Sequence, residues 1–214
     1  MNRLDLAIFD FDGTLADSAT WFRANFNHIA QRYGLRQITE NELEALRGQT
    51  NAAIIRHLNV PAWKLPFIAS YARKLIARDA HKIALFEGVD TLLSSLAESG
   101  ATVAIVTSNA EANVRRILGE ENAKRVSCYA CGVSMFGKAA KLRSVVKAMK
   151  ADPTRTIAIG DEARDIDAAR KAGVVAGAVS WGYATAELLR AQQPDHLFSS
   201  MDQIRQTVME LPVS

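Results

Sequence analysis

LDLAIFDFDGTL, residues 4–15, is a short apolar run followed by two aspartates, a glycine and a threonine. An apolar run that ends at Asp-Gly-Thr predicts a buried β-strand with a turn after it. In an extended chain Asp10 and Asp12 project from the same face, and Gly13 permits a tight turn and a close approach of the backbone to a ligand. Because the two carboxylates repel each other, a cation between them or a shared proton must compensate. Oxygen-rich sites of this kind suit Mg²⁺.

Three further apolar runs extend this pattern along the chain: TVAIVT (102–107), TIAIGD (156–161) and VVAGAVS (174–180). They are continuously apolar rather than alternating, as expected for parallel strands that are covered on both faces. Segments with apolar residues at helical spacing separate them, such as the one that ends at Gly100. This βαβ alternation predicts an α/β fold with a doubly wound, Rossmann-like parallel sheet, whose ligands bind beyond the carboxyl ends of the strands.

Residues 14–86 interrupt the alternation, because they contain helical patterns and no convincing strand. One amphipathic pattern ends at Gly34, and a capping box that begins at Thr39 starts the next helix. We therefore predict that residues 1–13 and 87–214 form the α/β core and that residues 14–86 form an all-helical cap inserted into it.

Polar residues follow the predicted strands at their carboxyl ends. Thr107, Ser108 and Asn109 follow the second run, where a hydroxyl and backbone N–H groups ahead of a helix would suit an anion. Asp161 and Asp165 follow the third run. Because parallel strands present their carboxyl ends together, we expect Thr107, Asp161 and Asp165 to meet Asp10 and Asp12 in one crevice.

The composition excludes several classes of protein. With 49% hydrophobic and 23% charged residues in 214, the chain is typical of a globular protein rather than a disordered one. A net charge of only +3 does not indicate nucleic acid as a partner. No apolar stretch approaches the roughly 18 to 20 residues that span a bilayer, and Asp5 lies where a secretory signal would be apolar, so we expect a cytoplasmic protein without a membrane partner.

Two cysteines, Cys128 and Cys131, have a spacing found in zinc and redox sites. No second cysteine pair and no nearby histidine completes such a site in the sequence. We expect both to be buried structural residues, and two cysteines are too few to staple a fold of this size.

DFDGT (10–14), the run that ends at Thr107, a lysine near position 138 and GDEARD (160–165) together resemble the haloacid dehalogenase superfamily of phosphotransferases. The resemblance spans nearly the whole chain and is to members with a helical cap inserted after the first motif. The tail, WGYATAELLRAQQPDHLFSSMDQI, also resembles that of phosphoglycolate phosphatase-like proteins.

The resemblance implies that Asp10 is a nucleophile, which attacks phosphorus and forms an aspartyl-phosphate. Asp12 would protonate the leaving group and then accept a proton from the hydrolytic water. Mg²⁺ would contact Asp10, Asp161 and the backbone carbonyl of Asp12, with Asp165 orienting the lysine or a metal-bound water. A haloacid dehalogenase in the strict sense would lack an acid at position 12, so Asp12 favours phosphate chemistry.

The same resemblance implies that Thr107 and the amide of Ser108 hold phosphoryl oxygens, with Asn109 and Gly13 beside them. Selectivity would come from the cap, where the glycine-bearing sequence RGQT follows the helix that starts at the capping box. Arg47 in this sequence offers a planar fork for a carboxylate or a second phosphate. Its alternative role is to stabilise the carboxyl-terminal end of a helix.

GKAAKL offers two lysines for the remaining motif, which often reads Lys-Pro in the family. We predict that Lys138 is the motif lysine, because it follows a glycine at the expected loop-to-helix junction. Lys141 lies one turn inside the expected helix, where it could simply be solvated.

The functional hypothesis is an Mg²⁺-dependent phosphatase acting on a small phosphomonoester such as phosphoglycolate, with the oligomeric state left open. One alternative is a phosphomutase of the β-phosphoglucomutase type, which returns the phosphoryl group to a sugar. Another, from a different class, is a non-catalytic metal-binding partner protein that retains the fold.

Overall fold

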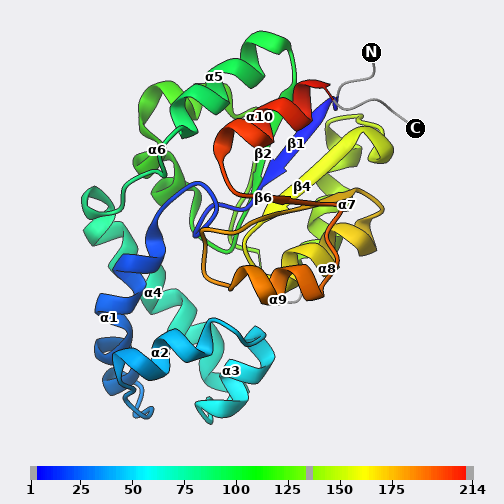
Figure 1. Ribbon diagram of the computed structural model, residues 1–214. Helices are drawn as coiled ribbons and strands as arrows, with labels where there is room; N and C mark the ends of the chain where they lie inside the picture. Colours follow the sequence, from blue (N-terminus) through cyan, green and yellow to red (C-terminus); the bar gives the residue numbers. More distant parts are fainter. Residues whose placement is uncertain (1–3, 134–136, 211–214) are drawn as a thin grey trace.

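A computed structural model describes residues 4–133 and 137–210, so the outermost ends of the predicted core segments lie outside the described residues. Its centre is a six-stranded parallel sheet of order β3-β2-β1-β4-β5-β6 (Figure 1). The strands are Leu6–Phe9 (β1), Thr102–Val106 (β2), Cys128–Ala130 (β3), Thr156–Gly160 (β4), Val175–Val179 (β5) and His196–Phe198 (β6). The parallel sheet and its flanking helices confirm the predicted doubly wound α/β fold.

Ten α-helices are present in the described residues, and short 3₁₀ turns lie between some of them. Five lie between β1 and β2, and the last of them packs on the sheet: Ser18–Arg32 (α1), Glu40–Leu46 (α2), Asn51–His57 (α3), Leu65–Asp79 (α4) and Val89–Ser99 (α5). The others are Glu111–Arg125 (α6), Lys138–Ala148 (α7), Ala163–Ala172 (α8), Ala186–Ala191 (α9) and Met201–Glu210 (α10). Not one helix in these described ranges is long and apolar enough to cross a membrane.

The core consists of two apolar layers, one on each face of the sheet. Along β1, Ala7 and Phe9 pack into the layer that contains apolar residues of α5, α6 and α10. Leu6 and Ile8 point to the opposite face, where α7, α8 and α9 supply the layer. Successive residues of a strand point to opposite faces of the sheet. Because this sheet is covered on both faces, every residue of the central strand β1 is buried, and the strand is apolar along its whole length.

Two strands, β3 and β6, were not expected from the sequence, which predicted four strands. Each has three residues and lies at an edge of the sheet. So short a strand has too few residues to show an apolar run. The expectation of buried cysteines was also wrong, because Cys128 in β3 and Cys131 just after it are only half-buried; both are free. The burial that remains raises the pKa of Cys131 to about 11, so its thiol stays protonated at neutral pH.

Helices α1 to α4 form a lobe beside the sheet (Figure 1). This lobe has a small apolar cluster of its own around Ile38, Leu46 and Leu58. It also joins the main core, since Trp21 of α1 and Leu75 of α4 belong to the apolar layer on one face of the sheet.

The chain leaves and re-enters the α/β part through two adjacent segments. The N–H of Asp17 donates to the carbonyl of Ala84 at 2.9 Å, and the N–H of Phe86 donates to the carbonyl of Leu15, also at 2.9 Å. The division into a core and a cap at residues 14–86 remains a prediction, and these two hydrogen bonds lie at its proposed boundary.

Leu93→Ala tests the apolar layer under α5, where Leu93 is fully buried. We expect the free energy of unfolding to fall by about 2 to 5 kcal/mol, because the substitution removes buried methyl groups and leaves a cavity. Urea denaturation followed by circular dichroism measures the change. Thr91→Ala, at an exposed position of the same helix, is the control and should change it by less than about 0.5 kcal/mol. Equal effects would contradict the packing described here.

Candidate active site

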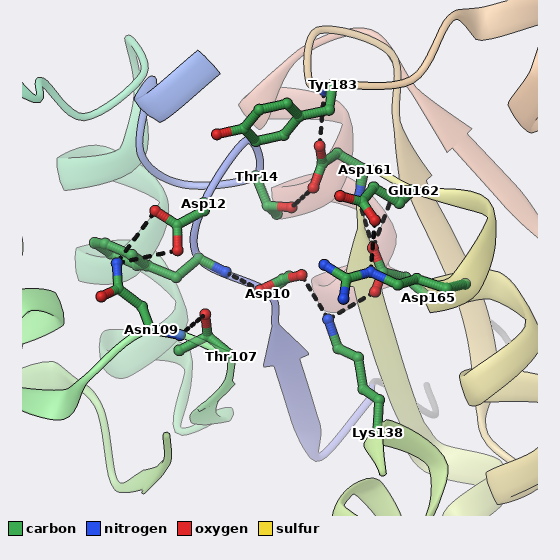
Figure 2. Close-up of polar contacts among 12 residues, drawn as sticks. Asp10, Asp12, Thr14, Thr107, Asn109, Lys138, Asp161, Glu162, Asp165 and Tyr183 are labelled. Atoms are coloured by element: carbon green, nitrogen blue, oxygen red, sulfur yellow. Dashed lines mark hydrogen bonds and ion pairs between the residues drawn. The ribbon is translucent and has the colours of Figure 1, made fainter. Parts of the chain in front are cut away.

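Three aspartates converge at the carboxyl ends of β1 and β4 (Figure 2). Asp10 follows β1, and its backbone N–H donates to the carbonyl of Ile159 in β4 at 2.8 Å, which joins the two strand ends. Asp10, Asp161 and Asp165 are buried, and one carboxylate oxygen of each lies within 4.8 Å of the others. The structure therefore brings the sequence-predicted aspartates of these two strands together.

Lys138 lies between two of these carboxylates. Its Nζ atom lies 2.6 Å from Oδ2 of Asp10 and 2.7 Å from Oδ1 of Asp165. Burial lowers the pKa of Lys138, but these two carboxylates more than offset it, and the pKa rises above its usual value. Lys141 is exposed one turn further along α7. Of the two candidate lysines, the structure therefore places Lys138 at the aspartates.

Asp161 is held by two hydrogen bonds and crowded by other carboxylates. Its Oδ1 accepts from the hydroxyl of Thr14 at 3.0 Å, and its Oδ2 accepts from the backbone N–H of Tyr183 at 2.7 Å. Burial and the charges of Glu162, Asp165 and Asp10 raise its pKa well above the usual value. A cation in the cluster would favour the ionised form and reverse this shift.

The donor set of this cluster fits Mg²⁺. Asp10, Asp161 and Asp165 offer only carboxylate oxygens, which are the hard ligands that Mg²⁺ prefers in proteins. The carboxylate of Asp12 lies apart and points toward Asn109 (Figure 2). Asp12 would therefore have to contribute to the metal site through its backbone carbonyl, as the resemblance implies.

Gly13 adopts a left-handed backbone conformation with φ of +78°. A Cβ atom at this position would collide with the carboxylate of Asp161 and the ring of Tyr183. The glycine is required because the turn after β1 passes directly against the end of β4. Its predicted contact with a substrate remains a prediction.

Asp12 is bound by an amide whose orientation is fixed. The Nδ2 atom of Asn109 donates to both oxygens of Asp12, at 3.2 and 3.0 Å. The Oδ1 atom of Asn109 accepts from the N–H of Ala110 and from Nδ2 of Asn113. Burial and the charge of Asp10 raise the pKa of Asp12 to about 6, which suits a group that both gives and takes a proton near neutral pH. The structure thus shows Asn109 in contact with Asp12.

Thr107 and Ser108 lie at the end of β2, close to Asp12. The hydroxyl of Thr107 is buried and accepts from the N–H of Asn109 at 3.1 Å, which leaves its own proton available for an acceptor. Ser108 is exposed and lines a cavity between the strand ends and helices α1 to α4. Their predicted contacts with phosphoryl oxygens remain a prediction.

A cavity of about 600 Å³ lies between these strand ends and helices α1 to α4. On the sheet side it is lined by polar groups that include Asp10, Asp12 and Ser108. On the helical side most of the lining is apolar, and comes from Phe22, Phe26, Leu43, Ile54, Ile55 and Ile76. The arrangement suits a ligand with one strongly polar end placed at the aspartates.

Sequence reasoning missed Glu162 and Arg164, which form an ion pair in the turn between Asp161 and Asp165. Asn51 of α3 donates to Oε2 of Glu162 at 2.7 Å, so this turn also contacts the helical lobe. Both residues line the cavity. Their position inside GDEARD, between two strand-end aspartates, was the available signal.

Arg47 joins the end of α2 to the loop after β5. Its Nε and Nη2 atoms donate to the carbonyls of Tyr183 and Gly182 at 3.0 and 3.1 Å, and its Nη1 donates to Glu44 at 2.8 Å. Its own carbonyl accepts from the N–H of Thr185 at 3.1 Å. Arg47 lines the cavity, yet three of its nitrogens already have partners. Its predicted contact with substrate remains a prediction.

Residues 7–179 match the family model of the haloacid dehalogenase-like hydrolases. The phosphoglycolate phosphatase of Synechococcus elongatus is 30% identical over 205 residues, which is 95% of this chain and 97% of that protein. The tyrosine-protein kinase PtkA of Mycobacterium tuberculosis is also 30% identical, over 189 residues. The match covers 86% of this chain but only 65% of that protein. A predicted phosphatase from Clostridium acetobutylicum shares the fold with a TM-score of 0.81 at 21% identity, covering 98% of this chain and 100% of that one.

Asp161→Asn tests the metal site. We expect the variant to bind Mg²⁺ at least about tenfold more weakly than the wild type, because one of three clustered carboxylate charges is lost. Isothermal titration of protein first treated with a chelator measures the affinity. Asp167→Asn removes an exposed acid of α8 that pairs with Lys171 and should leave the affinity unchanged. Unaltered Mg²⁺ binding by Asp161→Asn would place the metal elsewhere.

Proposed function

The chain belongs to the haloacid dehalogenase-like hydrolase family, and on this premise we propose that it is an Mg²⁺-dependent phosphatase of a small, phosphoglycolate-like phosphomonoester. The observation that carries the proposal is the position of Lys138 between Asp10 and Asp165, beside the predicted nucleophile and metal ligands. The Synechococcus elongatus relative named phosphoglycolate phosphatase supports the choice of substrate. The cytoplasmic location and the lack of nucleic-acid or membrane partners stay predictions of the sequence.

Asp10 has the fixed orientation that a nucleophile needs. Its Oδ1 accepts from the N–H of Phe11 at 2.6 Å and its Oδ2 from Lys138. In the proposed first step a carboxylate oxygen of Asp10 forms a bond to phosphorus while the ester P–O bond breaks, which gives an aspartyl-phosphate and a free alcohol. Water then attacks phosphorus, releases inorganic phosphate and restores the carboxylate.

Asp12 has the pKa for both proton transfers. With a pKa of about 6 it gives its proton to the leaving oxygen in the first step and takes one from the attacking water in the second. Hydrogen bonds from Ser18 and Asn109 oppose the rise and keep the ionised form accessible. The group can therefore change its protonation state within one catalytic cycle.

Charge compensation is the second task of the site, because the phosphoryl dianion must approach several carboxylates. Lys138 supplies one positive charge at the nucleophile. Asp10, Asp161 and Asp165 would hold Mg²⁺, which supplies the remaining positive charge for the phosphoryl oxygens. The hydroxyl of Thr107 and the N–H of Ser108 would bind those oxygens from the β2 side.

Phosphate release from a panel of phosphorylated acids, sugars and nucleotides, with Mg²⁺ and with excess chelator, tests the proposal. The panel includes tyrosine phosphate, because one relative is named a tyrosine-protein kinase. A phosphatase releases inorganic phosphate without bisphosphate activation, whereas a phosphomutase would need it. Absence of turnover across the panel would contradict the enzymatic proposal and favour a non-catalytic metal-binding protein. Full activity in chelator would contradict the role of the metal.

Asp10→Asn should abolish turnover while the fold remains intact, because an amide is a poor nucleophile and a weak metal ligand. We expect kcat to fall by at least about 10³-fold, as is usual when a covalent nucleophile is removed. Steady-state phosphate release measures the loss, and circular dichroism checks the fold. Asp5→Asn, which changes a partly exposed aspartate ahead of the same strand, is the matched control and should retain activity. Near-normal turnover by Asp10→Asn would exclude it as the nucleophile.

Lys138→Ala and Lys141→Ala separate the two candidate lysines. Lys138→Ala should lower kcat by about 10²- to 10³-fold, because a positive charge aimed at the reacting group is lost. Lys141→Ala should change it little, since this side chain is exposed on α7. Initial rates at saturating substrate compare the variants, and the reverse ranking would assign the motif to Lys141.

A further inference from the structure

Four arginines line the cavity, and three of them are ion-paired with glutamates: Arg23 with Glu40 and Glu44, Arg47 with Glu44, and Arg164 with Glu162. Arg73 differs, because within the described ranges no carboxylate lies in ion-pair distance of it. Its Nη1 atom has only a long hydrogen bond, of 3.4 Å, to the carbonyl of Ser108. In the part of the chain that the structure describes, no carboxylate therefore compensates the guanidinium of Arg73, and most of its N–H donors have no partner.

Arg73 lies on an apolar face of α4. Ala69, Ala72 and Ile76 of the same helix line the cavity beside it, at the spacing of one helical face. An uncompensated charge on an apolar, half-buried surface is unfavourable unless an anion is brought to it. The position therefore suits an anionic ligand within the cavity.

Hydrogen bonds hold this part of α4 against the proposed phosphate site. The Nδ2 atom of Asn113 donates to the carbonyl of Arg73 and to Oδ1 of Asn109, both at 3.0 Å. Asn109 in turn binds Asp12. The guanidinium of Arg73 reaches Ser108 from the helical side of the cavity, which is the side on which the leaving group of a phosphomonoester would lie.

We propose that Arg73 binds a carboxylate on the leaving group of the substrate and so selects acidic phosphomonoesters. A guanidinium can hold a carboxylate through two parallel N–H···O bonds, which the single carbonyl of Ser108 cannot offer. Arg47 is less suited to this role, since Gly182 and Tyr183 carbonyls and Glu44 occupy its donors. This inference rests on the proposed phosphatase function of the same site.

The test compares 2-phosphoglycolate with 2-phosphoglycolamide, in which an uncharged amide of nearly the same size replaces the carboxylate, as substrates of the wild type and of Arg73→Met. We expect the wild type to prefer the acid. Arg73→Met should lower the acid-to-amide ratio of kcat/KM at least about tenfold, mainly through KM for the acid, because a charge-assisted hydrogen bond is lost. Arg73→Lys should restore part of the ratio, since it keeps the charge without the planar fork.

Lys74→Met is the matched control, because it removes the same charge from an exposed position of the same helix and should keep the wild-type ratio. Three results would overturn the proposal. The first is an equal loss of kcat/KM for both substrates in Arg73→Met, and the second is an unchanged acid-to-amide ratio in both Arg73→Met and Arg73→Gln. The third is a fall in this ratio with Arg47→Met instead. A wild type that releases phosphate from neither compound nor from the wider panel overturns the phosphatase function as well, whereas an active wild type with an unaltered ratio overturns only the role of Arg73.

Discussion

Mutual repulsion among Asp10, Asp161 and Asp165 is the constraint on which the rest of the site depends. Two unit charges about 4 Å apart repel by roughly 4 kcal/mol at the effective dielectric constant of a protein surface, and these three carboxylates are buried within 4.8 Å of one another. Lys138 offsets part of this repulsion. The hydroxyl of Thr14 and the backbone N–H of Tyr183 donate to Asp161 and offset a further part. The remaining negative charge of the cluster favours a divalent cation.

That repulsion also divides the roles of the acids. Lys138 and Arg164 hold the pKa of Asp165 below its usual value even though burial raises it, so this group stays ionised. The carboxylate of Asp12 lies beside Asn109, away from Lys138. Burial and the charge of Asp10 raise its pKa to about 6. These two environments push the pKa values of the two acids apart, which fits the proposed roles of Asp165 as a charged group and of Asp12 in proton transfer.

The central strands and the meeting of the aspartates could be predicted from the sequence, because both follow from local hydrophobic patterns and from the geometry of parallel strands. Apolar runs marked the four central strands, and the rule that parallel strands end together placed Asp10 beside Asp161. The edge strands β3 and β6 were not predicted, because a strand of three residues is too short to show a hydrophobic pattern. The long-range partners of Arg47 and Glu162 could not be predicted. They are backbone carbonyls and an amide more than 100 residues away in the chain, which only tertiary packing brings near.

These long-range contacts connect the predicted cap to the chemistry. Helix α2 reaches the loop after β5 through Arg47, and α3 reaches the turn after β4 through Asn51. Helix α4 is joined to the segment after β2 by Asn113 of α6, which donates to the carbonyl of Arg73 and to Asn109. Tyr183 in the loop after β5 donates to Asp161, Glu162 directly follows Asp161, and Asn113 binds Asn109 beside Asp12, so movement of the helices would be felt at the proposed reacting groups. A neutral hydrogen bond adds only about 1 kcal/mol net, and one that involves a charged group, as those of Arg47 and Glu162 do, adds about 1.5 to 3 kcal/mol. A few such bonds can therefore align the site when closed and still break to admit a substrate.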